Sequence, residues 1–360
     1  MPSLNMKEAQ LYTHLEGQKV HCQLCSHGCI IQAGKFGFCG VRQNIKGVLY
    51  THNYAKLVAA NADPVEKKPL YHFLPGTFAF SVASVGCNFR CGFCQNWQIS
   101  QFNPRSLTPT GAAPDKNSKE IDFINQQLGE DFSAEQVVSL AKQNNCKSIA
   151  YTYTEPTIFF EFALETAKLA KEAGLYNIFV SNGYMSGEAV ILLQPYLDAA
   201  NIDLKFFRDS SYQKICSAHL QPVLDSILRL KDAGIWVEIT TLVIPGENDS
   251  LGELSGIANF IAEVNKDIPW HVSRFHADYK FNAYQDTPEQ TLKLACDLGS
   301  AAGLRYVYAG NVGSWGQDTL CPTCKKVLIK RAGFRIINLH VAKNRCIFCQ
   351  ADLAGVFNPA

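Results

Sequence analysis

Three closely spaced cysteines are the residues in this sequence best suited to redox chemistry. Cys87, Cys91 and Cys94 lie in the stretch 86–97, GCNFRCGFCQNW, with the spacing C-x3-C-x2-C, and the next cysteine is the distant Cys146. An ordinary 4Fe–4S cluster is held by four thiolates, one for each iron. With three, one iron keeps an open coordination position, which is the property of a reactive metal site. The spacing therefore predicts a catalytic iron–sulfur cluster, and a zinc knuckle or three buried thiols is the plainer alternative.

A second cysteine group stands near the N-terminus. Cys22, Cys25, Cys29 and Cys39 have the spacing C-x2-C-x3-C-x9-C, with several glycines among them that permit tight turns. Four thiolates around one zinc ion form a closed site that can stabilise a segment too short for its own core. We therefore favour zinc here, and a second 4Fe–4S cluster on the same four sulfurs is the alternative.

A third group lies near the C-terminus. Cys321, Cys324, Cys346 and Cys349 form two C-x2-C pairs separated by 21 residues of strand-like alternation. This spacing is typical of a zinc ribbon, and a single iron of the rubredoxin type is the alternative. The remaining cysteines stand singly in apolar patterns and are interpreted as small core residues. They are Cys146, Cys216 and Cys296.

The composition is that of a globular metalloprotein of the cytoplasm. The 360 residues are 47% hydrophobic and 18% charged, with a net charge of +1. This balance argues against an electrostatic nucleic-acid binder and against a membrane-surface protein. Cysteines in C-x2-C pairs are typical of reducing compartments rather than of secreted disulfide proteins. Neither a signal peptide nor an apolar run long enough to span a bilayer is expected.

Strands alternate with helices between residues 78 and 310. This order predicts a parallel sheet with right-handed crossovers, and about six such units fit a partial (β/α)6 barrel of the TIM type. A doubly wound, flavodoxin-like sheet is the alternative. The expected strands are 79–85, 148–153, 176–181, 199–204, 236–243, 271–275 and 306–309; the expected helices are 134–145, 157–173, 187–194, 220–233, 251–264 and 288–302.

The chain then divides into three parts. Residues 1–77 form an N-terminal four-cysteine unit and an arm, residues 78–310 the barrel, and residues 311–360 a zinc-ribbon-like unit. The polar stretch 103–132 is predicted to be a surface insertion. Three prolines in 63–76 predict an irregular arm. Its Lys67, Lys68 and His72 could line a substrate path, and a charged surface loop is the favoured alternative.

Polar residues follow the predicted strands at the points where they end. In open or closed α/β sheets, ligands bind at the carboxyl ends of the parallel strands. The segments concerned are the cysteine loop and 152–156, 181–184, 203–205, 240–249 and 273–279. Six such ends on one rim predict a binding site there, although each alone could be turn chemistry.

The longer stretch GCNFRCGFCQNWQIS resembles the cluster loop of the radical S-adenosylmethionine (radical SAM) enzymes. It is most similar to the branch with the pyruvate formate-lyase activating enzymes. The cysteine-rich units at both ends narrow the resemblance to the radical SAM member of the AmmeMemoRadiSam system. The resemblance implies a 4Fe–4S cluster whose open iron binds S-adenosylmethionine. It also implies reductive cleavage to methionine and a 5′-deoxyadenosyl radical, which abstracts hydrogen from a substrate.

Two motifs of the family can be carried over to strand ends. Glu155 resembles the acidic residue of the Gly-Gly-Glu-Pro-like motif, which accepts from the ammonium group of the cofactor, but Tyr153 and Thr154 replace the glycines. Asp203 and Lys205 resemble the D-x-K motif of the activating enzymes. The resemblance implies that Lys205 supplies a point charge for the carboxylate of S-adenosylmethionine.

The resemblance extends to four further cofactor-binding candidates. Ser181 and Asn182 resemble the strand end that faces the ribose, and Val243 the segment near the adenine. Val180 stands where activating enzymes have an aspartate, which puts a monovalent-cation site in doubt. His276 could contact the cofactor or the substrate. No catalytic residue beyond the cluster is expected.

The resemblance implies an oxidoreductase that acts on a partner protein, as glycyl-radical activating enzymes do. Memo-like or AMMECR-like proteins of the same system are partner candidates, and flavodoxin or ferredoxin is the expected reductant. Stretch 103–132 lacks the cysteine-rich ferredoxin-like insertion of many activating enzymes. Radical modification of a small molecule is one alternative. A non-catalytic iron–sulfur or zinc scaffold, or an electron carrier, is another.

Overall fold

The centre of the protein is an eight-stranded sheet in which seven strands run parallel. The computed structural model describes residues 6–102, 128–313 and 315–357. An eighth strand, at one edge, pairs antiparallel with its neighbour. In spatial order the strands are β16 (Val307–Gly310), β15 (Trp270–Arg274), β14 (Trp236–Val243), β13 (Ala199–Asp203), β12 (Tyr176–Ser181), β11 (Ser148–Tyr151), β9 (Phe78–Ala83) and β8 (Ala59–Pro64).

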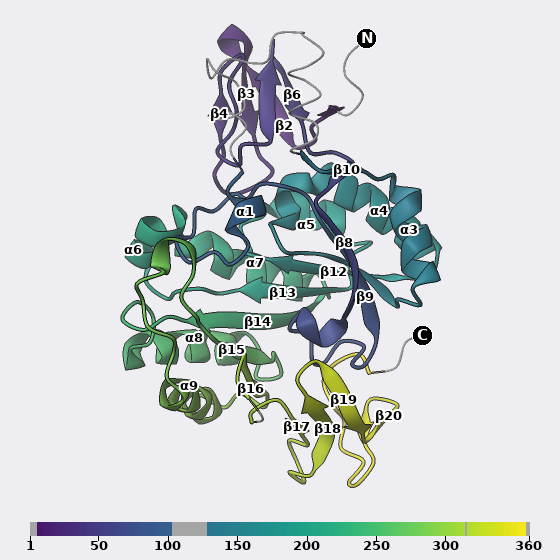
Figure 1. Cartoon of the computed structure of the whole chain (residues 1–360), viewed down its shortest axis with the longest axis vertical. Coiled ribbons are helices and arrows are strands. Elements are labelled where there is room, and N and C mark those ends of the chain that lie inside the picture. The colour runs from purple at the N-terminus through teal and green to yellow at the C-terminus, as the bar shows by residue number, and fades with distance from the viewer. Residues whose placement is uncertain (1–5, 103–127, 314, 358–360) are drawn as a thin grey trace.

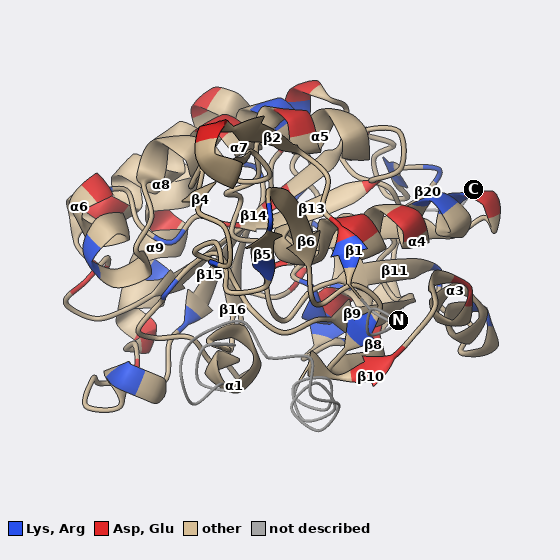
Figure 2. Cartoon of the chain, turned by 90° about the horizontal axis from the view of Figure 1, so that it is seen from above, with Lys and Arg blue, Asp and Glu red and all other residues tan. Residues whose placement is uncertain are grey.

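Helices cover the outer face of this sheet. They form an arc around the strands, and acidic and basic residues are interspersed along them (Figure 2). The edge strands β8 and β16 are not paired with each other, so the barrel stays open on one side. The predicted partial (β/α)6 barrel is confirmed. The covering helices are α3 (Ala134–Gln143), α4 (Phe160–Glu172) after the 3-10 turn η4 (Pro156–Phe159), α5 (Gly187–Leu193), α7 (Leu220–Asp232), α8 (Leu251–Val264) and α9 (Glu289–Ala301).

Sequence signals explain where several of these helices begin. Ser133 and Gln136 form a capping box at the start of α3. Ser250 caps α8 by accepting a hydrogen bond from the backbone N–H of Glu253. Among the described residues, no helix is both long and apolar enough to cross a membrane.

The N-terminal unit stands on the carboxyl-end side of the barrel as two small antiparallel sheets (Figure 1). One contains β2 (Tyr12–Leu15), β3 (Lys19–Cys22) and β4 (Ile30–Ile31), with η1 (Glu16–Gln18) after β2; the other contains β1 (Lys7–Glu8), β6 (Val48–Thr51) and β5 (Arg42–Ile45). A short pair, β7 (Lys56–Leu57) with β10 (Glu130–Asp131), adjoins them.

The predicted irregular arm is irregular only in part. Its first residues extend β8 along the whole of β9, with Asp63 opposite Ala79. A 3-10 turn, η2 (Val65–Lys67), follows. Beyond it, His72 is buried and its Nδ1 lies 2.8 Å from the carbonyl oxygen of Ala354. The arm therefore connects the barrel to the C-terminal unit.

The C-terminal unit lies at the opposite end of the molecule from the N-terminal unit (Figure 1). Its small core includes Leu328, Ile329 and two of its cysteines, all fully buried. Its strands are β17 (Thr319–Leu320), β18 (Val327–Ala332), β19 (Arg335–Leu339), β20 (Val341–Ala342) and β21 (Arg345–Cys346).

Short elements that the sequence did not predict surround the rim. They are α1 (Trp97–Ser100), α6 (Asp209–Ser211), the π-helix η5 (Tyr212–Cys216) and the 3-10 turn η6 (Tyr279–Phe281). Most of the predicted surface insertion, residues 103–127, lies outside the described residues, and only its end forms β10.

Candidate active site

A cavity of about 670 Å³ occupies the open barrel. The three closely spaced cysteines line it together with polar residues from the ends of β11, β12 and β13. The sequence-predicted residues that it brings together are Cys87, Cys91, Cys94, Glu155, Ser181, Asn182, Asp203 and Lys205. This grouping follows from the parallel sheet, because the carboxyl ends of its strands meet at one rim.

The cysteine loop is held by backbone contacts on both sides. Gly86 begins it with φ +99°, and a Cβ at this position would lie 2.9 Å from a methyl of Val41. The N–H groups of Arg90 and Gly92 donate to the carbonyls of Cys216 and Ile215, at 2.8 and 3.3 Å. A glycine is therefore required where the loop passes under the N-terminal unit.

The three sulfurs are suited to a cluster rather than to a single ion. Among the described residues, only the C-terminal set has three or more ligand atoms within 4.8 Å of one another. The sulfurs of Cys87, Cys91 and Cys94 are therefore more widely spaced, as ligands of separate irons must be. Burial raises the pKa of the Cys87 thiol well above its usual value, so its thiolate form needs a cation beside it.

Glu155 binds its own protein rather than pointing free into the cavity. Its side chain is 1% exposed. One carboxylate oxygen accepts from the N–H and hydroxyl of Thr157 and from the hydroxyl of Ser181, at 3.0, 2.6 and 2.8 Å. The other accepts from the N–H of Asn182 at 2.8 Å. Glu155 thus joins the ends of β11 and β12 and fixes the backbone that faces the cavity.

Lys205 is the cation beside the cysteines. Its Nζ lies 2.7 Å from Asp203 Oδ2, and its side chain is only 13% exposed. Burial opposes its charge, but the carboxylate of Asp203 outweighs burial and holds the pKa of Lys205 well above its usual value. Lys205 therefore carries a positive charge at this rim.

Asn182 links the end of β12 to the cysteine loop. Its Nδ2 donates to Asn88 Oδ1 at 2.7 Å and lies 3.8 Å from the sulfur of Cys87. Ser181, which is also buried, donates to Glu155 and accepts from the N–H of Gly183 at 3.0 Å. Both side chains thus orient the loop and the strand end.

Val243 and His276 do not line the cavity. Val243 is fully buried, and from β14 it is Thr240 and Leu242 that line the cavity. Successive side chains of a strand point to opposite faces, so Val243 faces the helices. His276 is exposed at the rim, where its Nε2 lies 2.9 Å from Nε2 of Gln95.

The cavity continues to the open side of the barrel. Lys67 of η2 and the next residue, Lys68, line it there, as does Phe334 in the β18–β19 turn. The Lys68 ammonium donates to Asp63 at 2.8 Å, and burial lowers the pKa of Lys68 to about 8. His72, in contrast, is buried away from the cavity.

The sequence missed two neighbours of the site. Cys216, interpreted as a core residue, is buried and places its sulfur 3.5 Å from that of Cys91. Tyr153 has φ +65°, the left-handed conformation that the glycine of the family motif would adopt freely. Its hydroxyl donates to Asp63, which anchors this strand end to the arm. In the sequence, the one sign of this role was that Tyr153 replaces a glycine of the family motif.

The two four-cysteine groups differ in geometry. In the C-terminal unit, the sulfurs of Cys321 and Cys349 are 3.6 Å apart and those of Cys324 and Cys346 are 3.8 Å apart. A tetrahedral zinc ion with Zn–S bonds of about 2.3 Å requires sulfurs about 3.8 Å apart. This set could therefore hold zinc. The N-terminal four surround a small separate cavity and are not this compact.

Comparisons with known proteins identify sequences that are similar to this chain. Residues 81–255 match the model of the radical SAM superfamily. An uncharacterized protein of Methanocaldococcus jannaschii is 43% identical over 348 residues, 96% of this chain and 98% of that protein. Pyruvate formate-lyase-activating enzyme of Clostridium pasteurianum is 21% identical over 212 residues, 54% of this chain and 79% of that enzyme.

One solved structure is a domain of pyruvate-formate lyase-activating enzyme from Bacteroides vulgatus ATCC 8482. It is 19% identical, with a TM-score of 0.41, and the match covers 46% of this chain and 99% of that chain. The cysteine loop, the parallel strands that carry the rim and the matched residues 81–255 all lie in the same part of the molecule. Residues 81–255 of the chain therefore form a radical SAM domain.

Proposed function

We propose that the protein reductively cleaves S-adenosylmethionine at a 4Fe–4S cluster on Cys87, Cys91 and Cys94 and abstracts hydrogen from a partner protein. The observation that carries this proposal is the shared cavity, in which the three cysteines face the Lys205 ammonium. When bound, the cluster and S-adenosylmethionine supply one-electron cleavage of the C5′–S bond and hence the hydrogen-abstracting radical. The protein supplies position and charge.

Each rim residue has a distinct task in this proposal. Lys205 binds the cofactor carboxylate as a point charge. Glu155 acts as a positioning residue, because four hydrogen bonds from the protein already occupy its oxygens. Thr154 and Asn182 line the cavity at the same strand ends, where their own donors already bind Ser84, Glu155 and Asn88.

The open side of the barrel supports a protein substrate. The cavity reaches from the cysteines to Lys67, which follows the edge strand β8, and to Phe334 of the C-terminal unit. An extended segment of a partner could enter through this open side. The similarity to a pyruvate formate-lyase-activating enzyme, whose name states a protein substrate, agrees with this. Memo-like or AMMECR-like proteins stay our partner candidates, with flavodoxin or ferredoxin as reductant, all in the cytoplasm.

Anaerobic reconstitution tests the activity. We expect the reduced protein to convert S-adenosylmethionine to 5′-deoxyadenosine and methionine. The Cys91→Ala variant should lose this activity, and Cys296→Ala, on α9 and outside the cavity lining, should keep it. Equal turnover by Cys91→Ala and the parent protein would rule the proposal out.

A pull-down tests the substrate class. Anaerobic co-purification followed by mass spectrometry should find a partner that is modified or cleaved only when S-adenosylmethionine and reductant are both present. If turnover is intact and only small molecules are modified, the partner-protein part of the proposal is wrong.

A further inference from the structure

We propose that the four cysteines of the N-terminal unit bind a second 4Fe–4S cluster, which delivers electrons to the cluster on the cysteine loop. The metal assignment stands on its own geometry, and the electron-delivery role rests on the proposed function above. Zinc, the reading that the sequence favoured for this set, fits its geometry less well. The set consists of Cys22, Cys25, Cys29 and Cys39.

The spacing of the sulfurs separates this set from the zinc-like set. Among the residues that the structure describes, the C-terminal cysteines are the one group of three or more metal-ligating side chains whose ligand atoms all lie within 4.8 Å. Neither the N-terminal four nor the three cysteines of the cluster loop are so compact. Thiolates that bind separate irons at the corners of a cube stand further apart than thiolates around one ion. The two wider sets therefore share the spacing of cluster ligands.

The space between the N-terminal sulfurs leads to the same conclusion. All four cysteines line a cavity of about 20 Å³, together with His27 and Arg42. A cavity of roughly 10–15 Å³ already admits a water-sized sphere. Four sulfurs in contact with one ion at about 2.3 Å enclose no such space. The four cysteines therefore border open space instead of closing on one point, as the ligands of a single zinc ion would.

A hydrogen bond connects this cavity to the cysteine loop. His27 lines the cavity, and its Nε2 lies 2.6 Å from the carbonyl oxygen of Asn88. Asn88 follows Cys87 directly in the chain. One side chain and one peptide group therefore separate the proposed second cluster from a ligand of the first.

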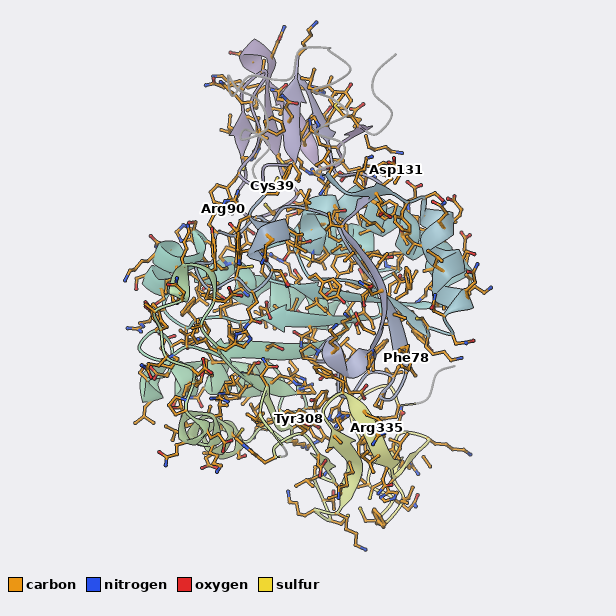
Figure 3. All side chains as sticks on the ribbon, in the orientation of Figure 1. Cys39, Phe78, Arg90, Asp131, Tyr308 and Arg335 are labelled. Atoms are coloured by element: carbon orange, nitrogen blue, oxygen red, sulfur yellow. The ribbon has the colours of Figure 1, made fainter. Side chains whose placement is uncertain are left out.

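A second contact brings the two loops together on the other side. The carbonyl oxygen of Cys39 would lie 3.3 Å from a Cβ at Gly86, the residue before Cys87. The Arg90 guanidinium stacks on the ring of Phe38 at 4.5 Å, and Phe38 also lines the N-terminal cavity. Cys39 and Arg90 mark this junction in Figure 3. Residues that border the two sites are therefore in direct contact, which suits electron transfer between two clusters.

The electron balance is simple. A low-potential one-electron carrier, such as reduced flavodoxin or ferredoxin, is oxidised by one electron at the N-terminal cluster. That cluster passes the electron on and returns to its oxidised state. The electron is consumed when the C5′–S bond of S-adenosylmethionine breaks and the sulfonium becomes the neutral thioether of methionine.

A triple variant tests the metal assignment. In Cys87→Ala/Cys91→Ala/Cys94→Ala, purified anaerobically as the full chain, we expect about four irons and about four sulfides per chain. Dithionite should give an electron paramagnetic resonance signal that S-adenosylmethionine does not change. An iron-free variant with zinc at both four-cysteine sets would overturn the assignment. As a matched control, Cys324→Ser should lower zinc and leave iron unchanged.

Two measurements test the delivery role. Reduced ferredoxin or flavodoxin should reduce the cluster that remains in the triple variant, and failure to do so overturns the role. In Cys25→Ser, with its loop cluster intact by resonance spectroscopy, 5′-deoxyadenosine should form with dithionite but fall to the no-carrier background with the protein donor. Equal rates with both donors would also overturn it. If the parent protein shows no turnover with any donor, the proposed function is contradicted instead. The metal assignment, which rests on the iron count of the triple variant, would still stand.

Discussion

The guanidinium of Arg42 and the carboxylate of Glu161 form an ion pair in which each side chain is 1% exposed. Arg42 lies on β5 of the N-terminal unit and Glu161 in the first turn of α4, on the barrel. Arg42 also donates to the carbonyl of Gln10 at 3.0 Å, and Glu161 accepts from the N–H of Gln10 at 2.7 Å. The pair therefore fixes the N-terminal unit to the barrel beside the four-cysteine cavity.

Removal of one partner should be costly. In Glu161→Ala, Arg42 stays buried without its counter-ion, and we expect the free energy of unfolding to fall by about 3–5 kcal/mol. Asp352→Ala is the matched control, because its pair with Arg345 is exposed on both sides and should contribute less than about 1 kcal/mol. Anaerobic urea denaturation compares the two. Similar losses would show that burial of the pair has no role.

Lys205 should determine the affinity for S-adenosylmethionine. A hydrogen bond to a charged group contributes about 1.5–3 kcal/mol, so Lys205→Met should weaken binding by about 10- to 100-fold. Lys214→Met, on the exposed side of η5, is the control and should bind as the parent protein does. Equilibrium binding to the reconstituted protein measures both. Unchanged affinity with unchanged iron content would remove Lys205 from the cofactor site.

Tyr153 should prefer glycine to alanine as a replacement. Its φ of +65° costs a non-glycine residue about 1–2 kcal/mol. Both variants lose the hydrogen bond to Asp63. We therefore expect Tyr153→Gly to be more stable than Tyr153→Ala by about 1 kcal/mol. Thr154 has no such conformation, so there glycine should be no better than alanine. Thermal denaturation ranks the four variants, and the opposite order at Tyr153 would refute the argument.

Stability should decrease as the pH falls from about 6.5 to about 4. Burial lowers the pKa of His72 to about 4. Its Nδ1 donates to the Ala354 carbonyl at 2.8 Å, so its Nε2 accepts from the Tyr308 hydroxyl at 2.6 Å and cannot take a proton. Between these pH values the unfolded chain binds the proton and the folded chain does not.

Full stability from this group is expected above about pH 6.5, with a loss of up to about 1.4 kcal/mol per pH unit below it. His52, also buried and with its pKa lowered to about 4, should act in the same window. Urea denaturation across this range should show a shallower slope for His72→Gln than for the parent protein. Equal slopes would mean that His72 is protonated in the folded state.

Loss of metal from the C-terminal four-cysteine set should unfold the C-terminal unit and leave the iron–sulfur cluster of the cysteine loop intact. Cys346 is fully buried among the few apolar residues of that unit, which cannot fold it without a metal. In Cys346→Ser we expect loss of about one zinc per chain, unchanged iron and new proteolysis within residues 321–357. Retained zinc and full protection from protease would contradict this.

The barrel could be predicted from the sequence because its signals are local. The bounds 176–181, 236–243 and 251–264 agree with β12, β14 and α8, where long apolar patterns and caps coincide. β8 could not be predicted, since Asn61, Asp63 and Pro64 have low strand propensity. Its neighbour β9 determines the pairing.

The candidate site was predictable where the residue type itself specifies the chemistry. The cysteine spacing identified the cysteine loop. The positions of Asp203 and Lys205 at the end of a predicted strand indicated that they belong to the site. The contact between Cys216 and Cys91 joins residues 125 positions apart. Cys216 lies in a π-helix, which cannot be predicted from a period in the sequence. Nor does the sequence show that four donors of the protein already occupy the carboxylate of Glu155.

The junction of the arm with the last residues of the chain has a consequence for biosynthesis. His72 and Leu74 exchange backbone hydrogen bonds with Val356 at 2.7 and 2.6 Å, and His72 contacts a residue 282 positions later. Contacts of such separation form late, because the intervening chain must be closed first. During synthesis, η2 and the wall of the cavity beside it cannot take their final place until residues 354–356 have left the ribosome. This wall of the cavity therefore forms after the strands of the barrel have been synthesised.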